Sequence, residues 1–435
     1  MPWRSADGAP LPRLPLAWFA LAHLLLLAGL LPVLVSPGRF VGVAIGAPFA
    51  GLVHALTLGW ITTSIFGAFQ IVAPLVLRWP IAERLVDRLL VGLWGLGVAL
   101  LLAAFHLPGV GRAPGAALAA LAGAGLLARL APGLARARAS RGLRAHFALA
   151  FVNFLAAITL GLLLAAGSIG PFALPGPRLP WIVVHAHLAA LGWALLLAMG
   201  FGYRLIPMLL PAVPPTGASL AASAVAIELG LVALAVELGG GGGARLAPVL
   251  LVAGVLFFLV QVGRMLARPL RPGPRRRSPD EARLHALQAI AWLGIATALG
   301  LVVAGRPGAA ADPRWLASYG VAGLAGFLGH LILAVSAQLL PAWAWIRRFG
   351  GGLPAGTPPP PGSEIGRGVA RTILVAWSAG VPLLLAGVAA QRAALLAAGG
   401  GALALAALAG LARLAALLRG PGPTATGPPA ASHPT

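Results

Sequence analysis

The chain contains no cysteine and no lysine, and only nine of its 435 residues are acidic. The absence of cysteine excludes disulfide bonds, zinc fingers and thiolate ligation of a metal. Charged residues make up only 9% of the chain and hydrophobic residues 59%. This composition cannot cover a folded chain of this length with a water-soluble surface. The sequence therefore predicts an integral membrane protein.

All 31 basic residues are arginine, and the formal net charge is +22. Such a charge can bind nucleic acid or anionic lipid. Here the arginines stand between apolar runs, which is typical of loops that anchor membrane helices on their cytoplasmic side. We therefore expect these arginines to lie at the lipid bilayer, and we expect no nucleic acid as a binding partner.

The chain is rich in apolar runs of the length that crosses a bilayer, which takes about 20 residues of helix. We predict an all-α integral membrane protein with twelve transmembrane helices. We expect it in a bacterial inner membrane with both termini in the cytoplasm, because 24 of the 31 arginines then lie on the inner side. The predicted spans cover residues 14–36, 48–77, 86–107, 113–133, 145–167, 181–210, 217–238, 246–267, 283–305, 316–345, 368–388 and 391–418.

The second and sixth runs repeat one another. The stretch "HALTLGWITTSIFGAFQIVAP", which begins at His54, aligns without a gap on the stretch that begins at His187, and Trp60 then falls on Trp193. The ninth run resembles the fifth in the same way, so the repeat unit has four helices. We expect one membrane domain over 1–419 with three pseudo-symmetric four-helix units at about 14–133, 145–267 and 283–418, and a disordered tail over 420–435.

Histidines inside predicted membrane helices need partners, because an unpaired polar group is costly there. His54 and His187 occupy equivalent positions, about 10 Å below the outer surface at 1.5 Å per residue. Their side chains can therefore approach one flat object from two sides. His185 is two residues before His187, which is about 200° of helical rotation. The two side chains must therefore point to opposite sides of the sixth span and serve different partners.

These features together resemble one known family. Three four-helix units, a histidine in the outer layer of the second span and an H-x-H motif in a later span look like the haem–copper oxidase subunit I superfamily, including its short NnrS-like relatives linked to nitric oxide. The resemblance covers nearly the whole chain in topology and about two spans in motifs. It implies that His54 and His187 are the axial ligands of a low-spin haem of the b type. It also implies that His185 is a ligand of a second centre.

The same resemblance implies electron transfer with nitric oxide or oxygen chemistry. Quinol or a separate cytochrome would supply the electrons. Members of the superfamily also bind copper through an adjacent histidine pair, which is absent from this sequence. His330 in the tenth span is the best remaining candidate for a second metal ion such as copper.

Glu228 lies in the middle of the seventh span, where an ionised carboxylate is costly. Two interpretations are open. The side chain is a step in a proton path between the cytoplasm and the metal layer, or it is a protonated acid that forms a hydrogen bond to a neighbouring helix.

Two other functions are open as well, and whether the protein is an enzyme is not decided by its sequence. A non-catalytic haem- or metal-binding protein would serve nitric oxide tolerance or assembly. A secondary transporter would use the twelve helices without a metal. Transporter repeats usually form two halves of six helices, whereas the unit here has four helices, which favours haem binding.

Overall fold

The computed structural model describes residues 13–42, 46–77, 81, 83–167, 174–217, 219–270, 280–306, 308–349, 360–363 and 365–419. Within these residues, twelve helices are long and apolar enough to cross a membrane, so the predicted all-α multi-pass membrane fold is confirmed. Each span begins and ends within four residues of a predicted run. The tail that we predicted to be disordered, 420–435, lies outside the described residues.

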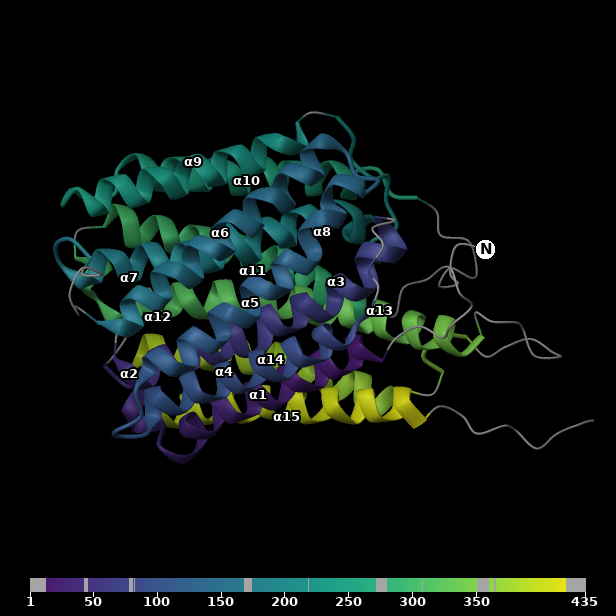
Figure 1. Ribbon diagram of the computed structural model, residues 1–435, viewed down its shortest axis with the longest axis horizontal. Coiled ribbons are helices and arrows are strands. Elements are labelled where there is room, and N and C mark those ends of the chain that lie inside the picture. Colours follow the sequence, from purple (N-terminus) through teal and green to yellow (C-terminus); the bar gives the residue numbers. More distant parts are fainter. Residues whose placement is uncertain are drawn as a thin grey trace, which may run out of the picture.

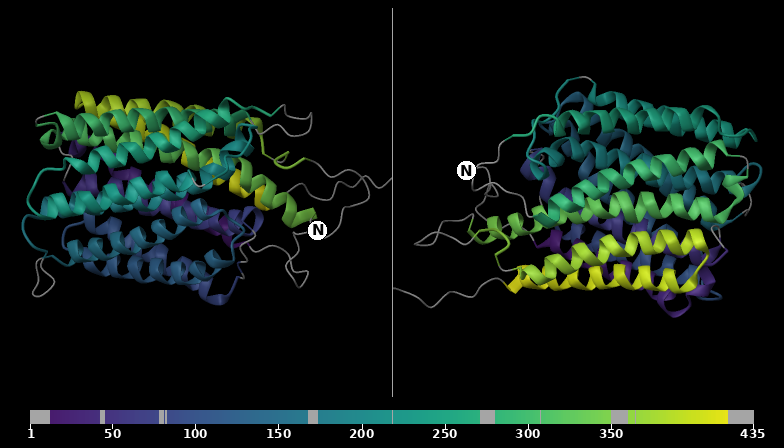
Figure 2. Two further views of the ribbon diagram at one scale, coloured as in Figure 1. Left: turned by 90° about the horizontal axis from the view of Figure 1, so that it is seen from above. Right: turned by 180° about the vertical axis from the view of Figure 1, so that it is seen from behind.

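Most spans are single continuous helices that run side by side along the bundle (Figure 1). These are α1 (Leu14–Val35), α4 (Leu85–His106), α5 (Arg112–Arg136), α6 (Arg141–Ala166), α9 (Leu220–Gly239), α10 (Leu246–Leu266), α11 (Asp280–Gly305), α14 (Arg367–Ala390) and α15 (Ala393–Arg419). The last two, α14 and α15, pack side by side along one edge of the bundle (Figure 2).

The second span of each four-helix unit is built differently, from a short helix, a π-helical stretch and a second helix. π-Helical turns are rare and often mark functional sites. The short helices lie together at the end of the bundle opposite the N-terminus (Figure 1). The three spans are α2 (Ala47–His54), η2 (Ala55–Thr62) and α3 (Thr63–Val76); α7 (Arg178–His187), η4 (Leu188–Leu195) and α8 (Leu196–Leu209); and α12 (Pro313–Gly320), η6 (Val321–Leu328) and α13 (Gly329–Phe349).

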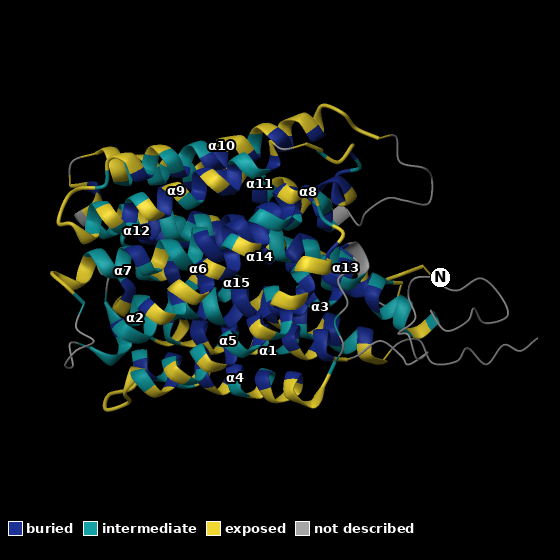
Figure 3. Cartoon of the chain, turned by 45° about the horizontal axis from the view of Figure 1, so that its top comes forward, coloured by how far each residue is buried: buried dark blue, intermediate teal, exposed yellow. Residues whose placement is uncertain are grey.

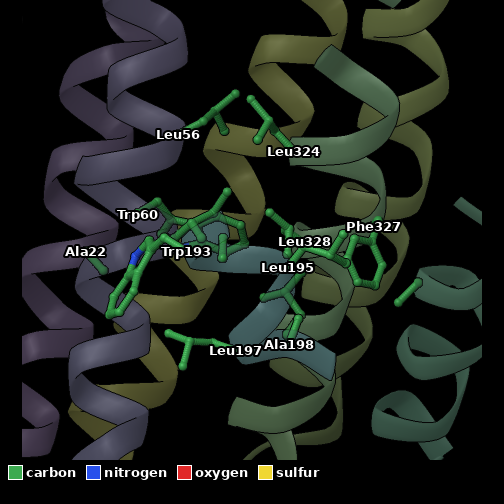
Figure 4. Close-up of a cluster of buried hydrophobic side chains, with 14 of the residues drawn as sticks. Ala22, Leu56, Trp60, Trp193, Leu195, Leu197, Ala198, Leu324, Phe327 and Leu328 are labelled. Carbon is green, nitrogen blue, oxygen red and sulfur yellow. The ribbon is translucent and has the colours of Figure 1, made fainter. Parts of the chain in front are cut away.

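The three π-helical stretches contact one another pairwise in the middle of the bundle. Figure 4 shows their side chains in one cluster, with Trp60 from η2, Trp193 and Leu195 from η4, and Leu324 and Leu328 from η6. All five side chains are buried. Because each stretch starts at the same spacing along the chain, the three units meet at this centre in equivalent ways.

Tryptophan side chains supply hydrogen bonds to these wide turns. The indole Nε1–H of Trp193 donates to Thr62 Oγ1 at 3.1 Å, and that of Trp377 donates to the carbonyl of Ala325 at 3.0 Å. A π-helical turn gives up regular i−4 backbone bonds, and inside a membrane the protein itself must supply the replacements. The indole of Trp377 therefore supplies a partner for a backbone carbonyl of η6, and that of Trp193 joins η4 to the side chain of Thr62 in η2.

The outer faces of the bundle are apolar. Exposed residues lie on the outside of the helices and at their ends (Figure 3). They include large aliphatic side chains such as Leu229, Val236 and Leu405. A membrane-spanning bundle with these faces contacts the lipid bilayer directly.

Inside the first unit, one carboxylate joins two helices. Asp87 of α4 accepts hydrogen bonds from Arg129 of α5 through both of its oxygens, at 2.9 and 3.2 Å. It also accepts the backbone N–H of Arg84 at 2.7 Å, which caps the start of α4. Such a two-point pair is specific and strong where it is shielded from water, and here the side chain of Asp87 is 9% exposed.

We expect Asp87→Ala to lower the free energy of unfolding by about 1 to 3 kcal/mol, because it removes both the two-point contact with Arg129 and the cap at the start of α4. The measurement is thermal unfolding of the purified protein in detergent. The control is Glu83→Ala, which removes the partner of an Arg88 side chain that is 68% exposed. This control should change stability by less than about 1 kcal/mol. Equal effects of the two substitutions would contradict the prediction.

Candidate functional site

Two imidazoles from different units face each other where the first unit meets the second. His54 is the last residue of α2, and His185 lies in the last turn of α7. Their ring centroids are 6.1 Å apart, and their ring planes differ by 19°. Both residues are only half-buried although they lie well inside their spans. We call this arrangement the first histidine pair.

The hydrogen bonds of this pair leave the same atom open on each ring. Nδ1 of His54 bonds the carbonyl of Ala50 at 2.7 Å, and Nδ1 of His185 bonds the carbonyl of Ala157 at 3.0 Å. Since a carbonyl only accepts, Nδ1 carries the proton in each ring. Within the described residues, neither Nε2 has a hydrogen-bond partner. A neutral imidazole fixed in this way presents the Nε2 lone pair that binds metals.

The surroundings hold both rings in place. Phe105 of α4 packs on His54 with centroids 4.9 Å apart, and the guanidinium of Arg112 lies 5.1 Å from the Phe105 centroid. On the other side, α6 passes His185 at Gly161. A Cβ atom at Gly161 would lie 2.7 Å from His185 Cε1, so only glycine leaves room for the imidazole.

We expected His54 to be paired with His187, but the structure brings His54 together with His185. His187 faces the third unit instead, where its ring lies 6.1 Å from that of Tyr319 with planes 28° apart. The prediction that the two histidines of the H-x-H motif point to different partners is thus confirmed. The pairing differs because His54 and His187, the last residues of α2 and α7, each lie against a residue one or two positions before the end of the next short helix.

The contact of His187 with Tyr319 has the same form as the first histidine pair. His187 Nδ1 bonds the carbonyl of Val183 at 2.8 Å, and its Nε2 has no hydrogen-bond partner within the described part of the chain. Tyr319 packs on Gly300 of α11, where a Cβ atom would lie 3.2 Å from the phenol ring, as His185 packs on Gly161. The sequence analysis missed Tyr319, although the matched glycines could have pointed to it.

The helix that carries Tyr319 begins at a capping carboxylate. Asp312 Oδ1 accepts the backbone N–H of Arg314 at 2.9 Å and its side-chain Nε–H at 3.2 Å. These hydrogen bonds hold the pKa of Asp312 below its ordinary value. The carboxylate therefore stays ionised and fixes the start of α12 at neutral pH.

A small cavity between the third and first units has apolar walls. Gly320 ends the third short helix where His54 and His187 end the other two, and it faces Leu52 and Val53 of α2. These residues line a cavity of about 40 Å³ with only apolar walls. The ends of the short helices thus lie in three different surroundings, two of which contain imidazoles.

Glu228 forms a hydrogen bond to a neighbouring helix. Its Oε2 accepts the amide N–H of Asn153 at 2.6 Å, and the same amide donates to the carbonyl of Leu149 at 2.9 Å. Asn153 packs directly on η4, where a Cβ atom at Gly192 would lie 2.6 Å from its side chain. This arrangement fits the interpretation as a hydrogen-bonded acid. A role in a proton path stays a prediction.

His330 pairs with His285 in the third unit. Their Nδ1 atoms are 2.8 Å apart, and both residues are fully buried. Across the described residues, no group of three or more histidines and acidic side chains is arranged to hold a metal ion. The metal role of His330 therefore stays a prediction, supported by one neighbouring imidazole.

His146 belongs to a satisfied polar network. Its Nδ1–H donates to the carbonyl of Gly142 at 2.8 Å, and its Nε2 bonds Ser223 Oγ at 3.0 Å. Ser223 Oγ in turn bonds the hydroxyl of Tyr203 at 2.9 Å. The network joins α6, α8 and α9, and it gives His146 a structural role.

The fold and this site define a multi-pass, all-α membrane protein with one imidazole pair between its first and second units. Comparison of the chain with protein-family models finds no match, and comparison with curated proteins finds none either.

We expect Ser223→Ala to lower the free energy of unfolding by about 1 to 3 kcal/mol, because it leaves the Tyr203 hydroxyl and His146 Nε2 buried without partners. Thermal unfolding in detergent measures the effect. The control is Thr297→Val, which removes a single bond of 2.8 Å to the carbonyl of Leu293 on the same helix. The control should stay within about 0.5 kcal/mol. A neutral Ser223→Ala would show that the network does not stabilise the fold.

Proposed function

We propose that the protein is a haem-binding membrane protein, and that one haem iron is held between His54 and His185. The observation that supports this proposal is the first histidine pair: two near-parallel rings, 6.1 Å apart, each with its Nε2 open. The pair lies at the interface between the first and second units.

The distance between the rings suits two ligands on opposite sides of one ion. With metal–nitrogen bonds of about 2 Å and ring nitrogens about 1.2 Å from their centroids, two such imidazoles have centroids about 6.3 Å apart. The centroids here are 6.1 Å apart. The Nδ1–H bonds to backbone carbonyls are also the type of support that orients metal-bound histidines.

The charge near the pair suits the carboxylates of a porphyrin. Arg112 and Arg178 are the first residues of α5 and α7, at the same end of the bundle as the pair. Arg112 lies over Phe105, which in turn packs on His54. We expect these two arginines to bind the propionate groups.

A haem iron with two imidazole ligands has no open position and supplies electron transfer. In the second contact, His187 offers one open Nε2 and faces Tyr319. This contact is the place where a second group with an open coordination position would act on nitric oxide or oxygen. Quinol or a cytochrome as electron donor, and a bacterial inner membrane with both termini inside, complete the proposal.

We expect the protein, purified after expression with excess haem, to give the reduced-minus-oxidised spectrum of a low-spin b-type haem. These bands should be lost in His54→Ala and in His185→Ala and kept in His187→Ala. Because the ring planes differ by only 19°, the ferric form should give a rhombic low-spin signal in electron paramagnetic resonance.

Rescue by free imidazole separates loss of a ligand from loss of the fold. His185→Gly should recover the bands when imidazole is added, because the small ligand fills the space of the side chain. Wild-type protein without haem bands would overturn the proposal and favour a transporter. If the haem bands were lost in His187→Ala and kept in His185→Ala, the result would instead support the pairing of His54 with His187 that we expected from the sequence.

The glycine beside His185 gives a second test. Gly161→Ala places a Cβ atom 2.7 Å from His185 Cε1, so we expect the imidazole to move and haem content to fall about tenfold. The matched control is Gly294→Ala in α11, where a Cβ atom meets nothing within 4 Å. It should keep the full spectrum and gain up to about 1 kcal/mol of stability, since alanine favours a helix. Equal haem content in both variants would argue against ligation by His185.

A further inference from the structure

Arg413 is a buried cation inside the bundle. It lies in α15, about 9 Å from the end of that helix at 1.5 Å per residue, and its side chain does not reach the surface because the residue is 4% exposed. Its Nη2 donates to Ser336 Oγ of α13 at 3.0 Å. Its Nε–H is buried and has no hydrogen-bond partner.

This guanidinium lacks a counter-charge in the part of the chain that the structure describes. The ion pairs found there are Arg88 with Glu83, Arg129 with Asp87 and Arg314 with Asp312. The titratable groups that interact electrostatically with Arg413 are imidazoles, those of His23 and His285. A buried charge without a partner costs several kcal/mol, so a negative charge from outside the chain would stabilise the site.

The neighbouring histidines add a second open donor. His285 and His330 share one hydrogen bond between their Nδ1 atoms at 2.8 Å, and both Nε2 atoms are buried without partners. In a neutral pair, one Nδ1 donates and the other accepts, so the accepting ring must carry its proton on Nε2. One unpaired N–H therefore faces the buried interior at this pair.

We propose that Arg413, His285 and His330 form a binding site for a small monovalent inorganic anion, such as chloride or nitrite. The unpaired Nε–H of Arg413 and the unpaired imidazole N–H are the donors that such an anion requires, and the guanidinium supplies the charge. The three residues come from α15, α11 and α13, and α13 contacts both of the other helices. The positive charge beside the imidazoles also opposes a metal cation there.

The test uses the full-length protein in detergent, in buffers with gluconate as the only anion. Sodium chloride and sodium nitrite are titrated in separately at constant ionic strength, and thermal unfolding is followed. Because a ligand that binds only the folded state stabilises it, the unfolding midpoint should rise with the logarithm of the concentration of at least one anion once that concentration exceeds the dissociation constant. A midpoint that is independent of both anions would overturn the proposal.

Substitution of Arg413 should raise the stability of the protein when no binding anion is present. In gluconate, Arg413→Gln should unfold at a higher temperature than the wild type, because it removes an uncompensated buried charge and keeps an N–H for Ser336. It should also lose the response to anions. Destabilisation by Arg413→Gln in every buffer would overturn the proposal, since it would mean that the protein itself pairs the charge.

Two further variants complete the experiment. The matched control is Arg264→Gln, which removes an exposed arginine from the last turn of α10 and should keep the full anion response. His330→Ala should weaken the affinity for the anion about tenfold, the effect of one lost charge-assisted hydrogen bond. An unchanged affinity in His330→Ala would show that the pair of His285 and His330 does not bind the anion. None of these measurements depends on haem, so their failure would not affect the proposal that the first histidine pair binds haem.

Discussion

The packing of three π-helical stretches against one another in the middle of the bundle decides the position of every other feature. Each stretch widens the second helix of its unit, and indole N–H groups from Trp193 and Trp377 bond the widened turns. In lipid such turns persist only where protein groups replace the missing backbone hydrogen bonds. The short helices that end at these stretches therefore lie together at one end of the bundle (Figure 1).

One geometry repeated three times gives three interfaces with different chemistry. His54 meets His185, His187 meets Tyr319, and Gly320 meets aliphatic side chains around a small dry cavity. The helices supply the same spacing in each case, and the side chains at two or three positions determine what the interface can bind. The same arrangement of helices therefore places polar rings at two of these interfaces and only apolar side chains around the cavity at the third.

Buried polar groups in this bundle are of two kinds. His146 and Glu228 have hydrogen-bond partners on neighbouring helices, which makes them part of the structure. The Nε2 atoms of His54, His185 and His187, and the Nε–H of Arg413, have none within the described residues. Of these four atoms, Nε of Arg413 is buried, where a missing hydrogen bond is costly, whereas the three histidines are half-buried.

The sequence by itself determined the membrane class, the twelve spans and the opposite directions of His185 and His187, because helix length and rotation follow from local geometry. It also suggested that the second and sixth spans are equivalent. Only the tertiary structure decided that His54 lies opposite His185, that Tyr319 faces His187, and that the second helices widen into π-helical turns. Those features depend on how one unit packs on the next, and contacts between distant segments leave no periodic signal in a single chain.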